Sequence, residues 1–166
     1  MSPPMPAGYS GLQIVLHWLI AGLIVFLLVF GESMKEFMEA AEHGTSLDAG
    51  ERFLADSHYW VGLAVLLLAS FRVGLRLTQG RPAAGDQRPS LAERIAGAMH
   101  VLFYFLLFAV PATGLLAYYV SEDFGEIHEM AKPVFIVTNA VHAAAALVHQ
   151  FWMKDGTLAR MIIPAR

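Results

Sequence analysis

The sequence predicts an all-α membrane protein in which four transmembrane helices form one bundle. Of its 166 residues, 57% are hydrophobic and only 15% are charged, which is too apolar a composition for an ordinary soluble domain. The apolar residues gather in four stretches, each long enough for the roughly 20 residues that cross a bilayer. The chain also has seven histidines, and most of them fall within these stretches. The length suits a single domain covering residues 1–166.

The four predicted spans have distinct characters. They cover about residues 11–31, 57–78, 94–120 and 127–153. The first is almost uninterrupted ("GLQIVLHWLIAGLIVFLLVFG"), and the third is long enough to tilt. The fourth is the least hydrophobic because it holds Lys132, Asn139 and its histidines, and such polar residues usually face the interior of a bundle. Pro133 lacks an amide hydrogen, so we expect the fourth span to kink or restart there.

The distribution of charge predicts the orientation of the spans. One side of the membrane receives eight basic and three acidic residues, and the other receives three basic and eleven acidic ones. The basic residues of the first side are Arg72, Arg76, Arg81, Arg88, Arg94, Lys154, Arg160 and Arg166. The positive-inside rule therefore places both termini and the 79–91 connection on the cytoplasmic side. The N-terminus lacks a basic region before its apolar run, which predicts a retained span and not a cleaved signal.

Composition also excludes several classes of function. The chain has no cysteine, which excludes disulfides, thiolate metal sites, iron–sulfur clusters and cysteine nucleophiles. A net charge of −3 without a basic tract argues against a nucleic-acid partner.

In the long outer connection 32–56, the segment "MKEFMEAAEH" predicts a short amphipathic helix at the membrane surface.

Four histidines pair by depth once the orientation is assigned. His58 and His128 open the second and fourth spans near the outer face, whereas His17 lies in the cytoplasmic half of the first span. His142 follows His128 by fourteen residues, which is about 21 Å of helix rise and returns to within some 40° of the same face. His58 therefore matches His128 at an outer level, and His17 matches His142 at an inner level.

Two imidazoles at each of two levels have the arrangement that bis-histidine haem ligation requires. Zinc or copper also accepts imidazole, but two histidines without carboxylates at the same depth make a poor tetrahedral set. Gly62, one turn after His58, leaves room for a flat macrocycle, although small residues also serve close helix packing. Arg72 and Arg76 share a helix face and suit the inner haem propionates; they suit a cytoplasmic anchor equally well. A metal or proton transporter without haem is a more distant alternative.

Three segments resemble the bacterial cytochrome b561 family: "LQIVLHW", "EIHE" and "HAAAALVHQFWMKDGTLARM". Members of this family are di-haem, four-helix proteins of the inner membrane. The resemblance implies that His17 with His142, and His58 with His128, are the axial ligands of two haem b groups. One branch of the family resembles a superoxide oxidase, which takes an electron from superoxide outside and reduces ubiquinone in the membrane. Related cytochrome b subunits instead carry electrons from hydrogenases or dehydrogenases to quinone.

A quinone site is expected at the inner end of the fourth span. Quinone reduction needs hydrogen-bond donors, a flat apolar slot and a proton source. His149 can supply a donor and a proton, Trp152 one wall of the slot, and His100 can close the site from the third span. Trp152 also fits an ordinary interface anchor, and a lone intramembrane histidine such as His100 or His149 can simply bond to a neighbouring helix.

The electron donor is the most open question. Superoxide is the first choice, because the resemblance points to it and the short chain holds no further domain for another donor. Lys132, one turn from His128, can guide an anion or hold a haem propionate; an interfacial anchor explains it equally well. The eleven acidic residues on the outer side would repel superoxide and favour a cationic partner. The alternative is therefore an electron-transfer subunit that docks a hydrogenase, a dehydrogenase or a c-type cytochrome.

Overall fold

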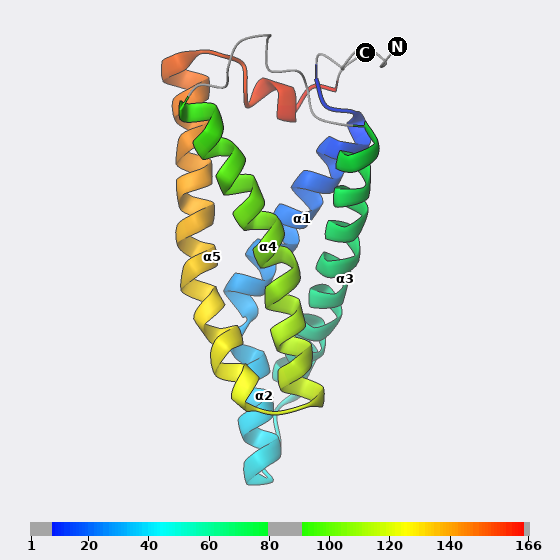
Figure 1. The fold of residues 1–166 in the computed structure, drawn as a ribbon. Helices are drawn as coiled ribbons and strands as arrows, with labels where there is room; N and C mark the ends of the chain where they lie inside the picture. Colours follow the sequence, from blue (N-terminus) through cyan, green and yellow to red (C-terminus); the bar gives the residue numbers. More distant parts are fainter. Residues whose placement is uncertain (1–7, 80–90, 165–166) are drawn as a thin grey trace.

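A computed structural model describes residues 8–79 and 91–164, and these residues are helical throughout apart from short connections. The elements in chain order are α1 (Gly11–Phe30), α2 (Glu32–His43), α3 (Ala49–Gln79), α4 (Leu91–Tyr119), α5 (Asp123–Val148), the π-helical turn η1 (His149–Met153) and the 3-10 turn η2 (Ala159–Met161). Figure 1 shows that α1, α3, α4 and α5 form an elongated bundle and that α2 projects from one end. We call this the α2 end and the opposite one the η2 end.

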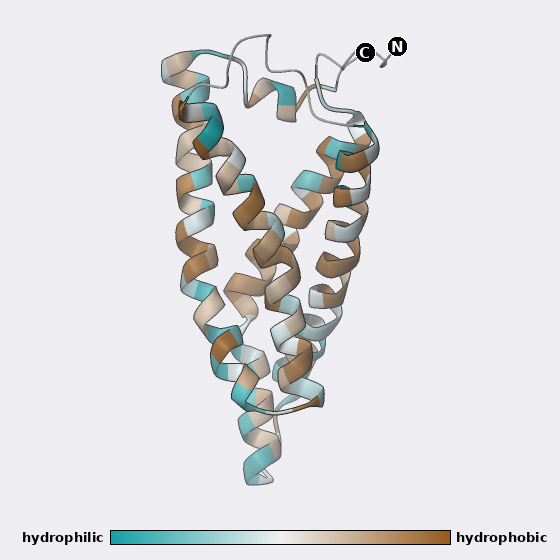
Figure 2. Ribbon diagram, viewed as in Figure 1, coloured by the Kyte–Doolittle hydropathy of each residue, from teal (hydrophilic) through white to brown (hydrophobic). Residues whose placement is uncertain are grey.

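Four of the helices are long and apolar enough to cross a membrane, which confirms the predicted fold class. These are Gly11–Phe30, Ala49–Gln79, Glu93–Tyr119 and Asp123–Met153. Figure 2 shows hydrophobic residues along these helices and a largely hydrophilic α2. Large apolar side chains also point out of the bundle, for example Leu67 and Phe71, which are 71% and 57% exposed. Such a surface is stable in lipid but not in water.

Local hydrogen bonds explain where the helices begin and end. The side chains of Ser10 and Gln13 bond to each other's backbone amides at 3.3 and 3.0 Å, forming a capping box at the start of α1. Asp48 and Glu51 make the same reciprocal contacts before α3. Because of this cap, α3 begins at Ala49, before the predicted start of the span at residue 57. The cap lies in polar sequence that hydropathy does not detect.

Pro133 does not break the fourth span, so the expected restart is wrong. Helix α5 runs from Asp123 to Val148 with Pro133 inside it, and α4 likewise contains Pro111. Membrane helices tolerate internal prolines because neighbouring groups satisfy the freed backbone carbonyl. Consequently, His128 and His142 lie on one continuous helix.

The buried core lies between the four long helices. Its members come from every one of them: Ile20, Ile24, Val65, Ala69, Leu106, Leu107 and Phe135. This core separates the level of His58 and His128 from the level of His17 and His142. Three of the basic residues that predicted the orientation, Arg81, Arg88 and Arg166, lie outside the described residues.

Candidate functional site

At the α2 end, the side chains of His58 on α3 and His128 on α5 face each other. Their ring centroids are 5.9 Å apart. Nδ1 of His128 lies 2.9 Å from the carbonyl oxygen of Val110, which also accepts a hydrogen bond from the Thr113 hydroxyl. Because a carbonyl only accepts, Nδ1 of His128 carries the proton and Nε2 is left free to bind a metal. Val110 and Thr113 were not predicted as site residues.

Open space adjoins this pair. Two cavities, of about 310 and 570 Å³, are both lined by His58, His128 and Gly62. A side chain at Gly114 would crowd the site, because an ideal Cβ there would lie 3.0 Å from Cε1 of His128. Nδ1 of His58 is buried and has no hydrogen-bond partner within the described part of the chain. Only a group that pairs with Nδ1 itself would remove the cost of leaving this nitrogen unpartnered.

Toward the η2 end, three imidazoles meet instead of the two that the sequence predicted. The ring of His142 on α5 is 6.3 Å from that of His17 on α1 and 5.8 Å from that of His100 on α4. Phe103 packs against the same ring at 5.2 Å. Nδ1 of His100 contacts the backbone carbonyl oxygen of Ala96 at 2.6 Å. His100, expected at the quinone site, therefore lies beside a proposed haem ligand.

The two predicted propionate ligands both contact neighbouring helices. Arg72 donates from Nη1 to the backbone carbonyl of Gln13 on α1 at 3.0 Å. The Arg76 guanidinium lies over the ring of Tyr104 on α4, 5.3 Å from its centroid, a cation–π contact. Arg72 is thus on the level of the His17 and His142 pair, and Arg76 lies one turn further toward the η2 end.

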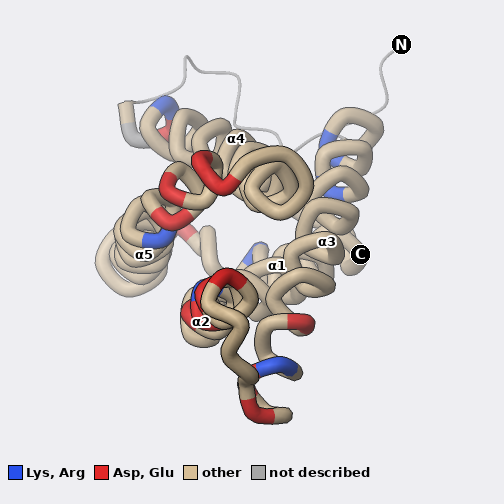
Figure 3. The backbone as a smooth tube through the Cα atoms, turned by 90° about the horizontal axis from the view of Figure 1, so that it is seen from below, with Lys and Arg blue, Asp and Glu red and all other residues tan. Residues whose placement is uncertain are grey.

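Two crossed ion pairs join α2 to α5 at the α2 end. Lys132 pairs with Glu32, and its hydrogen bond holds the pKa of the Glu32 carboxyl below its usual value. Lys35 lies 3.6 Å from Glu129. All four side chains line the smaller cavity beside His58, so the start of the 32–56 connection covers this site. Figure 3 shows acidic residues gathered on α2 and at the start of α5.

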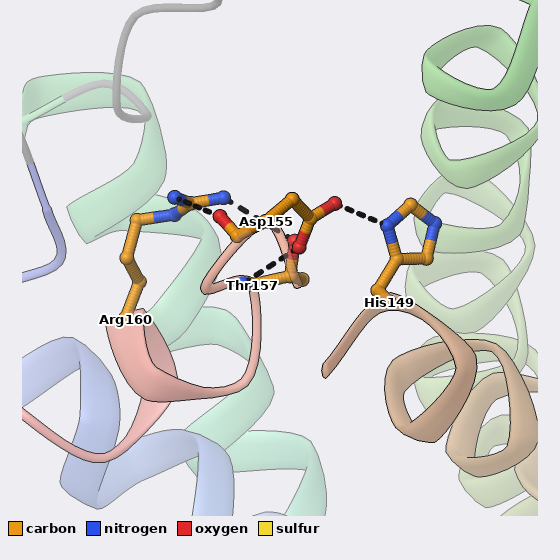
Figure 4. A network of polar contacts seen from close by, with 4 residues as sticks. All are labelled: His149, Asp155, Thr157 and Arg160. Carbon is orange, nitrogen blue, oxygen red and sulfur yellow. Dashed lines mark hydrogen bonds and ion pairs between the residues drawn. The ribbon is translucent and has the colours of Figure 1, made fainter. Parts of the chain in front are cut away.

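His149 forms a polar network with the segment that follows α5 (Figure 4). Its Nδ1 lies 2.5 Å from Oδ2 of Asp155, and its side chain is 27% exposed. Partial burial raises the pKa of the Asp155 carboxyl, but hydrogen bonds from His149 and Thr157 outweigh burial and lower it to about 2. Trp152, on the same turn, is 87% exposed, which is typical of an interface anchor.

Comparison with known proteins identifies the family of this chain. Residues 8–163 match the family model described as prokaryotic cytochrome b561. The chain belongs to the prokaryotic cytochrome b561 family. It is therefore a multi-pass bacterial membrane protein from a family of electron carriers that bind haem b.

Three relatives in this family match nearly the whole chain. Cytochrome b562 of Cereibacter sphaeroides is 36% identical over 158 residues, covering 95% of this chain and 96% of its own. The protein named probable superoxide oxidase CybB of Yersinia pestis is 23% identical, with 93% and 95% covered. Cytochrome b561 homolog 1 of Escherichia coli is 26% identical, with 93% and 96% covered.

The ring separations of both histidine pairs would allow an iron to lie between the two imidazoles. A metal–imidazole bond is about 2 Å long, so an iron between two imidazoles places the ring centroids roughly 6 Å apart. The distances of 5.9 and 6.3 Å fit this spacing. Among the described residues, no cluster of three or more histidine, aspartate or glutamate side chains could hold a metal ion by itself. The residues present thus suit haem better than a tetrahedral ion.

Substitution of Gly114 tests the site at the α2 end. In Gly114→Val, the new side chain would displace the His128 ring, and such overpacking costs about 1–3 kcal/mol. We therefore expect roughly tenfold weaker haem binding at this level, measured by titrating haem into purified protein. Gly97→Val is the matched control on the same helix, since nothing lies within 4 Å of a Cβ at Gly97. Equal haem affinity in the two variants would contradict the placement of haem beside Gly114.

Proposed function

We propose that this chain is a di-haem electron carrier that transfers electrons from the periplasmic side of the inner membrane to ubiquinone, with superoxide as the donor. The observation that carries the proposal is the presence of two imidazole pairs, each at haem spacing, at two depths of one bundle. His58 and His128 would hold one haem b, and His17 and His142 the other. When bound, the haems supply one-electron redox centres at two levels of the membrane.

Charge supports an orientation with the α2 end in the periplasm and the η2 end in the cytoplasm. Most basic residues of the described part of the chain lie toward the η2 end of the bundle. They are Arg72, Arg76, Arg94, Lys154 and Arg160. Helix α2 and the start of α5 carry most of the acidic ones. The positive-inside rule places the basic side in the cytoplasm.

The proposed overall reaction conserves atoms and charge. Two superoxide anions give up one electron each and leave as two molecules of oxygen. One ubiquinone gains the two electrons and takes two protons to become ubiquinol. The likeness to the Yersinia protein named probable superoxide oxidase supports superoxide as the donor. Lys35 and Lys132 border the cavity beside His58 and would attract an anion whenever their glutamate partners separate from them.

His149 is the proposed proton donor to ubiquinone at the cytoplasmic end. It follows the ligand His142 by two turns of α5 and opens the π-helical turn η1. Such π-helical insertions are frequent at functional sites. Positioned acid–base groups contribute about 10²–10⁴-fold to rate. We expect His149→Ala to lower quinone reduction at least tenfold while both haems remain bound, as measured by haem content and quinol formation in parallel.

A second candidate function follows from the acidic α2 end. An electron-transfer subunit would use this surface to dock a cationic redox protein, and its donor would be that partner instead of superoxide. The crossed ion pairs support this alternative, because in them each lysine of the cavity is neutralised by a glutamate.

One experiment separates the two candidate functions. Purified, haem-loaded chain is mixed with ubiquinone and enzymatically generated superoxide, and ubiquinol is measured with and without superoxide dismutase. We expect ubiquinol formation well above that of a haem-free control and its loss on addition of the dismutase. The superoxide oxidase proposal would fail if superoxide gave no ubiquinol. If a reduced basic c-type cytochrome then reduced the haems of the chain rapidly, the electron-transfer subunit would be the function.

A further inference from the structure

The segment after α5 folds into a turn that presents one carboxylate to His149. The chain leaves η1 through Lys154, which has φ +53°, and Gly156, which has φ +71°. Left-handed backbone of this kind favours glycine. Oδ1 of Asp155 accepts the backbone N–H of Thr157 at 2.9 Å, so the side chain is locked by its own turn. Its other oxygen, Oδ2, is directed at Nδ1 of His149 (Figure 4).

A second residue holds the turn without touching the carboxylate. Arg160 donates from Nη1 to the backbone carbonyl of Asp155 at 3.0 Å and from Nη2 to the Thr157 hydroxyl at 3.2 Å. The segment is also tied to α1, because the indole N–H of Trp18 donates to the carbonyl of Met161 at 2.8 Å. The carboxylate therefore approaches His149 from a fixed position, although the segment lies outside the bundle.

The contact determines which nitrogen of His149 is free. An ionised carboxylate only accepts hydrogen bonds, so Nδ1 of His149 is the donor and Nε2 is directed away from Asp155. Nε2 can take a proton from water at the membrane surface and pass it to a group bound beside it, while Nδ1 keeps its own proton against the carboxylate. Histidine–carboxylate pairs in catalytic sites orient the imidazole ring in this way.

We propose that Asp155 is a positioning residue that holds His149 with Nε2 presented to ubiquinone, and that this pair delivers a proton to the quinone from the η2 end. The inference rests on the proposed function of His149. In the proton-transfer step, the Nε2–H bond breaks as an O–H bond forms on a quinone oxygen. The ring is left neutral and regains its proton from water at the membrane surface. The second proton of ubiquinol enters in the same way after the second electron.

Asp155→Asn tests the pair against two matched variants. Asparagine keeps the shape of the side chain but loses its charge, whereas Asp155→Glu restores the charge. Arg160→Gln removes two hydrogen bonds from the same turn but leaves the carboxylate. We expect Asp155→Asn to lower kcat for ubiquinone reduction about 10–100-fold, with KM changed less than threefold and haem content unchanged. Asp155→Glu should recover part of kcat, and Arg160→Gln should stay within threefold of wild type.

A double-mutant cycle distinguishes positioning from mere support of the fold. If Asp155 acts only through His149, Asp155→Asn lowers kcat no further in a His149→Ala background. An equal loss of kcat in both backgrounds, or an equal loss in Arg160→Gln, would overturn the proposal. In reduced protein labelled with ¹⁵N-histidine, the Nδ1 proton of His149 should give a low-field resonance that Asp155→Asn lacks. Its absence in the wild type would also overturn the pairing.

The role of Asp155 and the role of His149 are tested by different variants, so either one can fail without the other being misjudged. Wild-type kcat in His149→Ala would show that the quinone is reduced elsewhere, and the assignment of His149 would fail. Impaired His149→Ala together with unimpaired Asp155→Asn would leave that assignment intact and overturn only the role of Asp155.

Discussion

The His142→Ala protein is expected to bind one haem per chain, and the wild type two. His142 contributes the imidazole that α5 supplies at the η2-end level, and its ring lies 6.3 Å from that of His17. Its removal would leave a haem iron at that level with a single protein ligand, whereas His58 and His128 are unchanged at the other level. A pyridine haemochrome spectrum set against chain concentration measures the ratio. An external donor should still reduce the haem that remains.

His43→Ala is the matched control for this variant. His43 is exposed at the end of α2 and bonds to the backbone carbonyl of Glu39, so its loss should leave two haems. Retention of two haems in His142→Ala would overturn the ligand assignment. A wild-type ratio near one would limit haem to a single level, and a ratio of zero in haem-supplied cells would return the histidines to metal or proton transport.

The second large effect distinguishes the two histidines that contact His142. We expect His17→Ala to lose the haem of the η2-end level and His100→Ala to keep it. The family resemblance pairs His17 with His142, and the centroid distance of 6.3 Å suits an intervening iron. His100 lies equally close, at 5.8 Å, so distance alone does not decide between them. Haem content and the low-spin optical spectrum of each variant give the answer.

The opposite result would reassign the ligand to α4. If His100→Ala lost one haem and His17→Ala kept both, the haem at the η2-end level would be held by α4 and α5. These two helices already meet there, since Phe103 packs against His142. A double variant should then behave as His100→Ala does. Loss of one haem in each single variant would mean that both rings are needed to shape the site.

The parts of this molecule that follow from local sequence could be predicted. Hydropathy located the four spans because lipid requires about 20 apolar residues in a row. Helical geometry placed His128 and His142 at two depths because fourteen residues have a fixed rise and rotation. The ring of His128 faces that of His58, and the ring of His142 faces that of His17, as expected from the pairing by depth. The restart expected at Pro133 does not occur, because a helix packed among neighbours tolerates a proline that would end an isolated helix.

Contacts that depend on chain folding at a distance could not be predicted. Nothing in the spacing of His149 and Asp155 shows that the chain turns back through a π-helical turn and two left-handed residues. The pairing of Lys132 with Glu32 joins residues a hundred positions apart. The approach of His100 to His142 depends on the rotation of α4, which a symmetrical apolar span does not reveal. By contrast, the Asp48–Glu51 cap before α3 did carry a sequence signal, a capping-box pattern.

The continuity of α5 through Pro133 has a thermodynamic consequence. One helix supplies an imidazole to each level, so whatever orders it for one haem also orders it for the other. If both levels bind haem as proposed, and binding at one level orders α5 for the other, each haem raises the affinity for the other by the same factor. When haem is scarce, the population should then consist mainly of chains with two haems and chains with none. A shortage of haem would thus lower the number of fully loaded chains, while each loaded chain would keep its full activity.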